Sequence, residues 1–175
     1  MIVWGDPSGF SLLPQHVRTW ARHGHGHTPV LRVPLTRDHR AAIAALTPHQ
    51  RLVMPTQTTA YHSTDVVRFL RVLWRKSSGQ LLIIWDGAPI HRGQPIKDCL
   101  ARGAAKRSHR EQLPGYAPDL TPVEGICNSL QCRDLGTVCC RDFTALATAL
   151  RRAQERLRHK RRVIRGCIAE CGYRL

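Results

Sequence analysis

The stretch LLIIWDGAPIHR, residues 81–92, contains an apolar run that stops at an acid. Residues 81–85 have the length and composition of a buried strand, and Asp86 follows at its carboxyl end, directly before a Gly-Ala-Pro turn. Open α/β sheets bind their ligands at the carboxyl ends of strands. Asp86 is therefore a candidate ligand for Mg²⁺, the usual partner of carboxylates that handle phosphates.

Strand and helix signals alternate on both sides of this stretch. Residues 2–4 predict a short strand that ends near Asp6, because Pro-Ser-Gly follows. Ser63 or Thr64 can cap a helix whose apolar residues recur at steps of three and four and which ends near residues 77–79. Further strands are expected at 30–33, 41–46, 52–54 and 108–113, and further helices at 96–105 and 143–163. This order predicts a single domain of mixed α/β layers.

The composition is strongly basic, with 27 Lys and Arg against 12 Asp and Glu and a formal net charge of +15. The natural partner of such a domain is a polyanion. Arg residues outnumber Lys residues 23 to 4, and Arg suits forked contacts with phosphate. A merely soluble basic surface, with an Arg content raised by a GC-rich genome, is the alternative explanation. No apolar run approaches the roughly 18 residues that span a membrane, so a cytoplasmic protein is expected.

Many of these cations lie in the C-terminal helix, where a solvated helix face is the alternative to phosphate binding. The candidate phosphate contacts there are Arg151, Arg152, Arg158, Arg161 and Arg162. No helix-turn-helix pattern precedes them, so nothing in the sequence is expected to read bases.

Seven cysteines and one His-rich run raise the question of a zinc site. Cys127, Cys132, Cys139 and Cys140 lack the paired C-x2-C spacing of zinc modules, so small buried hydrophobic residues are the favoured interpretation. The odd number of cysteines leaves one unpaired, and reduced thiols are expected. The glycines of HGHGH, residues 23–27, favour an exposed loop over a metal site.

A second informative segment is LPGYAPDLTPVEGI, residues 113–126, where three prolines and a glycine precede Glu124 in an extended loop. Thr121 is a good N-cap and Pro122 suits the first position of a helix. Glu124 then stands three residues after the cap, so it can close a capping box on the Thr121 amide. The alternative is that Glu124 joins Asp6 and Asp86 in one site.

Four segments together resemble the catalytic domain of insertion-sequence transposases related to the mariner superfamily, which are DDE endonucleases. They are GDPSGFSLLP (5–14), RTW with TPVL (18–20 and 28–31), IIWDGAPIHR (83–92) and LPGYAPDLTPVEGI (113–126). The resemblance covers nearly the whole chain. It implies an RNase H-like mixed sheet flanked by helices in a single domain, with the catalytic part at 1–142 and the basic helix of 143–175 packed on it or extending it.

The same resemblance implies that Asp6, Asp86 and Glu124 hold two Mg²⁺ or Mn²⁺ ions, with Asp86 bridging them. Two such ions activate an oxygen nucleophile, compensate charge at phosphorus and stabilise the leaving oxygen. The implied reaction is metal-dependent cleavage of a DNA strand by water, followed by attack of the freed 3′-hydroxyl on a target strand. The implied partner is therefore DNA, both element ends and target, with the protein associated with the nucleoid when bound.

The sequence departs from the family pattern at Pro7, Thr121, Cys127 and Gln131, where an acid, Asn, Trp and Lys are typical. Met1 lies five residues before Asp6, so the family's N-terminal DNA-binding region is expected to be separately encoded or truncated, with an upstream-encoded half or a homodimer completing the protein. The alternative function is a catalytically inactive transposase remnant that binds nucleic acid only through its basic surface.

His91 and Arg92 follow the Asp86 turn closely. Both are candidate contacts to the DNA backbone near the metals. For His91, capping of the next helix is an equal alternative.

Overall fold

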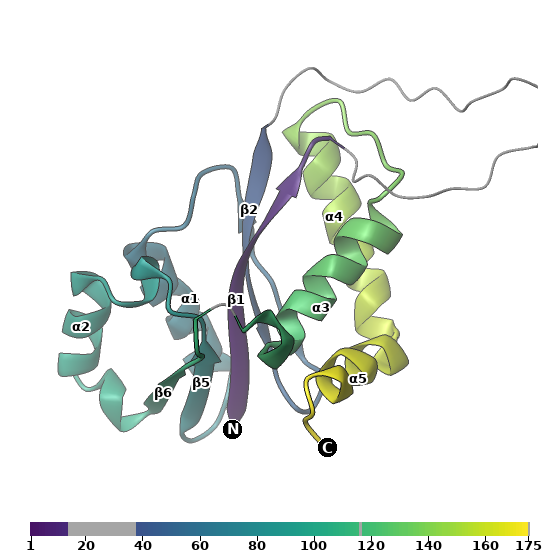
Figure 1. Ribbon diagram of the computed structural model, residues 1–175. Helices are drawn as coiled ribbons and strands as arrows, with labels where there is room; N and C mark the ends of the chain where they lie inside the picture. Colours follow the sequence, from purple (N-terminus) through teal and green to yellow (C-terminus); the bar gives the residue numbers. More distant parts are fainter. Residues whose placement is uncertain (14–37, 116, 175) are drawn as a thin grey trace, which may run out of the picture.

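The computed structural model of the chain describes residues 1–13, 38–115 and 117–174 (Figure 1). A mixed sheet lies between two groups of helices, as predicted. The strands are β1 (Ile2–Ser11), β2 (His39–Leu46), β3 (Leu52–Val53), β4 (Thr56–Gln57), β5 (Leu81–Trp85) and β6 (Ser108–Gln112). The helices are α1 (Ser63–Lys76), α2 (Gln94–Ala101), α3 (Pro122–Ser129), α4 (Phe143–His159) and α5 (Arg161–Glu170). The expected strand at 30–33 and the HGHGH run lie outside the described residues.

The sheet order is β3-β2-β1-β5-β6, with β4 also paired to β2. β1 runs antiparallel to β2 and parallel to β5, and β5 runs parallel to β6. The parallel strands are connected through helices, which is the usual way to return the chain to the same end of a sheet. The carboxyl ends of β1, β5 and β6 therefore point in the same direction.

Side-chain alternation along the strands separates two cores. Val3, Ile43 and Ile83 belong to the core beneath α1 and α2. Trp4 and Ala44, one residue further along β1 and β2, belong to the core beneath α3, α4 and α5. Figure 1 shows these helix groups on either side of the sheet. The C-terminal helices thus share a core with the strands.

β1 corrects one prediction, because the strand does not end near Asp6 but continues through Pro7 to Ser11. Pro7 lies opposite Ile43 of β2. The Ile43 amide donates to the Pro55 carbonyl, at 3.3 Å, and so points away from β1. Pro7 therefore occupies a position that needs no hydrogen bond to β2, and β5 has already ended on its other side. Asp6 is consequently in mid-strand.

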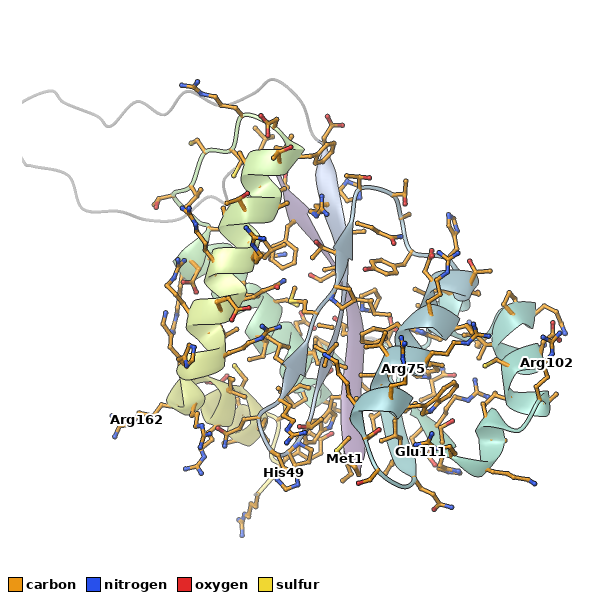
Figure 2. All side chains as sticks on the ribbon, turned by 180° about the vertical axis from the view of Figure 1, so that it is seen from behind. Met1, His49, Arg75, Arg102, Glu111 and Arg162 are labelled. Atoms are coloured by element: carbon orange, nitrogen blue, oxygen red, sulfur yellow. The ribbon has the colours of Figure 1, made fainter. Side chains whose placement is uncertain are left out.

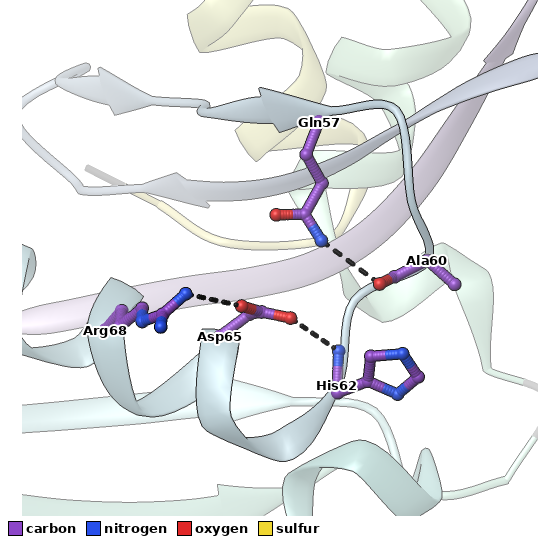
Figure 3. A network of polar contacts seen from close by, with 5 residues as sticks. All are labelled: Gln57, Ala60, His62, Asp65 and Arg68. Atoms are coloured by element: carbon purple, nitrogen blue, oxygen red, sulfur yellow. Dashed lines mark hydrogen bonds and ion pairs between the residues drawn. The ribbon is translucent and has the colours of Figure 1, made fainter.

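The N-terminus of α1 also differs in detail from the prediction. Its N-cap is His62, one residue before Ser63. The Asp65 carboxylate accepts a hydrogen bond from the His62 amide at 3.0 Å and contacts Arg68 at 3.2 Å (Figure 3). Asp65 thus satisfies a backbone donor at the helix start, where an acid is also favoured by the helix dipole.

The predicted long helix of residues 143–163 is wrong, because the chain breaks at Lys160 into α4 and α5. Leu150 and Leu157 of α4 share the core with Ile164 of α5. Both helices therefore bury apolar residues in the same core, with the bend at Lys160 between them. The second predicted helix, 96–105, begins earlier, at Gln94, and ends at Ala101. It stops because Gly103 adopts a left-handed backbone (φ 103°), which favours glycine.

Within the described ranges, no helix is long and apolar enough to cross a membrane.

Candidate functional site

The register between β1 and β5 brings Asp6 and Asp86 side by side. Gly5 pairs with Trp85 as the last pair of the parallel ladder, so the two aspartates occupy the next position on their strands. Asp6 follows Trp4 by two residues, and Asp86 follows Ile84 by two. Both Trp4 and Ile84 pack in the core beneath α3. Because side chains alternate along a strand, the two carboxylates face the same side.

Glu124 reaches this side from the first turn of α3. The capping alternative is not observed, because the Thr121 amide donates to the Pro118 carbonyl at 3.0 Å. The Thr121 side chain makes no cap hydrogen bond, and its buried Oγ1 has no partner in the described part of the chain. α3 is held at its start by Pro122 and by a hydrogen bond from the Glu124 amide to the Thr121 carbonyl, at 3.1 Å. The Glu124 side chain is therefore left free of the cap.

One pocket of about 650 Å³ is lined by all three acids. Its remaining wall comes from the turn after β5 and from the loop that leads from β6 to α3, including Gln112, Pro114 and Pro118. The motifs at 81–92 and 113–126 thus meet at one opening. Asp86 is followed by an Asx-type contact, in which the Ala88 amide donates to Asp86 Oδ1 at 3.3 Å and orders the turn.

The electrostatics of the pocket bear mainly on Asp6. Burial, then the nearby charges of Asp86 and Glu124, raise the pKa of Asp6 from 3.8 to about 7. Asp6 therefore keeps a proton under mildly acidic conditions, mainly because it is buried and also because the neighbouring carboxylates repel its charge. A bound cation would relieve the same repulsion.

The donor chemistry fits a hard divalent cation, because three carboxylates offer oxygen ligands of the kind that Mg²⁺ and Mn²⁺ prefer. However, no three His, Cys, Asp or Glu side chains among the described residues are arranged so that they could hold a metal ion. Binding by the three acids would require their side chains to turn toward a common centre. The three acids thus line one pocket without being arranged around a common metal position.

His91 lies behind Asp86, with only 2% of its side chain exposed. Its ring stacks on Trp85 with centroids 4.2 Å apart and planes at 18°. Nε2 lies 2.9 Å from Asp86 Oδ1 but is not aligned for a hydrogen bond, so both ring nitrogens lack such a partner within the described residues. Burial lowers the pKa of His91, against the opposing effect of Asp86. Neither expected role is seen, since a phosphate would find almost no ring surface and α2 has Gly93 as its N-cap.

Cys127 and Gln131, which depart from the family pattern, contact β1 near the pocket. These contacts were not predicted from the sequence. Cys127 is buried close to Ser8, Asp6 and Glu124, and burial raises the pKa of its thiol to about 12. Gln131 donates from Nε2 to the Gly9 carbonyl at 2.7 Å. Both therefore connect α3 and the following turn to β1. The one sequence signal for these contacts is the four-residue spacing of Cys127 and Gln131, which places them on one face of a helix.

The predicted phosphate contacts on α4 and α5 are exposed, but they do not form one continuous row, because the helix breaks at Lys160. Arg161 lines a pocket with His49, and Arg162 lines another with Arg133. Arg158 pairs with Glu155. Arg92 is exposed beside the Asp86 turn. Arg151 and Arg152 have no ion-pair partner in the described part of the chain.

The four cysteines considered for zinc differ in their surroundings. Cys127 and Cys140 are buried, Cys139 is half-buried and Cys132 is exposed. The Cys132 thiol donates to Asn128 Oδ1 at 3.0 Å. Cys127 belongs to the core beneath α3, whereas Cys140 packs with Leu12 and Leu146 in a separate small cluster.

The fold and the pocket define a class, namely an RNase H-like α/β domain with three acids in one pocket, where the parallel pairing of β1 and β5 ends. Solved structures share this fold. The pre-cleavage Mos1 transpososome has a TM-score of 0.61 at 13% identity, over 99% of this chain and 56% of that chain. The mariner Mos1 paired end complex with Mg has a TM-score of 0.60 at 17% identity, over 99% and 56%. A simian T-cell lymphotropic virus intasome in complex with PP2A regulatory subunit B56 gamma has a TM-score of 0.53 at 12% identity, over 85% and 46%.

A family model described as DDE superfamily endonuclease matches residues 1–145. The chain therefore belongs to the DDE superfamily endonucleases, as its motifs predicted. It spans about half the length of the Mos1 chains that it resembles. A search of the curated proteins finds no match to the sequence.

Proposed function

We propose that the chain is the catalytic domain of a transposase, which cleaves DNA strands and transfers them to a target with the help of divalent metal ions. The observation that carries this proposal is the convergence of Asp6, Asp86 and Glu124 on one pocket from two strands and one helix. Membership of the DDE endonucleases supports the reaction class. The formal charge of +15 supports DNA as the substrate.

In this proposal Asp6, Asp86 and Glu124 would hold two Mg²⁺ or Mn²⁺ ions. Solved complexes of the similar Mos1 protein contain Mg or Mn, which supports the choice of metals. When bound, the ions supply an activated oxygen nucleophile and stabilise the charge that develops at the transferring phosphoryl group.

The chain's own residues would prepare this site. Stacking of His91 on Trp85 holds the imidazole behind Asp86 and limits the positions open to that carboxylate. Gln131, in the turn that follows α3, donates to the Gly9 carbonyl of β1 and so would help to hold Glu124 of α3 near Asp6 of β1.

DNA would approach from the open side of the pocket. Arg92, beside the Asp86 turn, is the nearest of the predicted phosphate contacts along the chain. Arg151, Arg152, Arg158, Arg161 and Arg162 would add contacts further away. The catalytic part of the chain comprises residues 1–142, and the helices of 143–175 pack on the same core. We expect an upstream-encoded DNA-binding half or a second copy of the chain to take part in the recognition of element ends.

The test is nicking of supercoiled DNA in Mg²⁺ or Mn²⁺. Asp86→Asn should lower the nicking rate about 10³-fold, since the metals contribute several kcal/mol to such reactions. Asp119→Asn is the matched control, because Asp119 is an exposed acid in the loop between β6 and α3 and does not line the pocket. Equal nicking by both variants and the parent would refute the assignment. A parent that binds DNA but never nicks it would instead favour the inactive remnant.

A further inference from the structure

A second pocket, of about 690 Å³, lies between α1 and α2. Four arginines line it, Arg68 and Arg71 from α1 and Arg102 and Arg107 from the segment after α2. The lining includes one acid, Asp98, whose Oδ1 accepts a hydrogen bond from Gln94 at 2.7 Å. The described wall of the pocket thus carries an excess of three positive charges.

The four guanidinium groups are not equally available. Arg107 donates from Nη2 to the carbonyls of Trp74 and Ser77, both at 3.2 Å, which anchors it against the end of α1. Arg68 contacts Asp65 at 3.2 Å. Arg71 and Arg102 are exposed and have no partner in the described part of the chain. Arg107 and Arg68 therefore shape the pocket wall. The guanidinium groups of Arg71 and Arg102 have their donors free for a ligand.

This pocket is separate from the carboxylate pocket, with which it shares no lining residue. α1 and α2 cover the core on the face of the sheet opposite α3, α4 and α5. Figure 2 shows Arg102 and Arg162 at opposite sides of the molecule. The arginines of α1 and α2 are therefore not an extension of the basic residues on α4 and α5.

We propose that the α1–α2 pocket binds the phosphate backbone of DNA and gives the domain a second DNA-binding surface, on the face of the sheet away from its acids. Guanidinium groups suit phosphate oxygens because they can donate two parallel hydrogen bonds. The carboxylates of an acidic polypeptide would accept the same forked hydrogen bonds, but the formal net charge of +15 and membership of the DDE endonucleases favour DNA.

The proposal shares DNA as the substrate with the proposed function, but it does not depend on cleavage. The test is binding of a short fluorescent duplex to the full chain in a chelator, followed by anisotropy over a range of salt concentrations. Arg71→Gln/Arg102→Gln should weaken binding about tenfold or more near 0.1 M salt and reduce the salt slope by about 1 to 2, as expected for one or two lost phosphate contacts.

The charge-matched control is Arg75→Gln/Lys76→Gln, on the same helix but outside the pocket. It should change affinity less than twofold. Equal losses in the two double variants would overturn the proposal in favour of a diffuse charge effect. Loss of poly-glutamate binding with unchanged DNA binding would overturn it in favour of an acidic protein partner. The Asp86→Asn protein should bind DNA with the same dependence on Arg71 and Arg102, so failed nicking and a failed second surface remain distinguishable.

Discussion

His91 Nε2 lies 2.9 Å from Asp86 Oδ1, while the His91 ring stacks on Trp85, the residue before that acid. The imidazole is buried, so it does not contact solvent or a ligand directly. It acts on Asp86 by limiting where that carboxylate can lie. This relationship makes His91 a positioning residue for the proposed site.

Replacement of His91 separates packing from this contact. His91→Phe keeps a ring against Trp85 and should change the free energy of unfolding by less than about 1.5 kcal/mol, while nicking falls about 10- to 100-fold. His91→Ala should cost about 2 to 4 kcal/mol, because it leaves a cavity. Urea unfolding and plasmid nicking measure the two effects. His109→Phe is the control, since His109 makes a similar contact with Glu111 at an exposed position. Full nicking by His91→Phe would contradict the positioning role.

Asp6 should make the stability of the metal-free protein depend on pH. Its pKa is about 7 in the folded protein against 3.8 ordinarily, so the folded state holds more protons between these values. Stability should therefore fall as pH rises from about 4 to 7 and stay low above that. Asp6→Asn should remove this loss and be more stable than the parent by about 1 to 3 kcal/mol at pH 8. Urea unfolding in a chelator at pH 5 and pH 8 tests this, and parallel pH profiles for both proteins would disprove it.

Gly125 permits close packing of α3 on α5, because a Cβ added there would lie 3.1 Å from Cys167 Sγ. Gly125→Ala should be less stable than Gly166→Ala by about 1 to 3 kcal/mol. Gly166 is the control, since it is also helical but its added Cβ would meet nothing within 4 Å, so alanine there should stabilise by up to about 1 kcal/mol. Thermal unfolding of both variants gives the comparison. Equal melting temperatures would mean that Cys167 yields without cost.

Asp134 anchors the bend between α4 and α5. Its carboxylate, only 7% exposed, lies 3.1 Å from Arg156 Nη2 and 3.7 Å from Lys160 Nζ, at the residue where the helices meet. Asp134→Asn should cost about 1 to 3 kcal/mol, because it leaves two cations without their buried partner. Glu155→Gln breaks the exposed pair with Arg158 and should cost less than about 0.5 kcal/mol. Urea unfolding of both variants tests this, and an Asp134→Asn protein as stable as Glu155→Gln would argue against the anchor.

Local pattern was enough to predict several elements. The apolar run of 81–85 became β5, and the three- and four-residue spacing after residue 63 became α1, because each buries one face or stripe that its own sequence defines. The strands at 41–46 and 108–113 were also predicted within two residues of their observed bounds. Predictions were wrong where a distant part of the chain changes the local preference. Pro7 was expected to end β1. The strand continues because Ile43 of β2 directs its amide to Pro55, and β5 has already ended, so no hydrogen bond from the Pro7 nitrogen is required.

The sequence by itself determined the candidate acids, the basic charge and the family, because these depend on residue types and spacing within short motifs. Only the tertiary structure decided that Gly5 pairs with Trp85, that His91 is buried behind Asp86 and that four arginines meet between α1 and α2. Each of these relationships joins segments that are distant in the sequence, through packing or strand register. Such contacts form, and stabilise the protein, only when the sheet and its two helical layers have assembled.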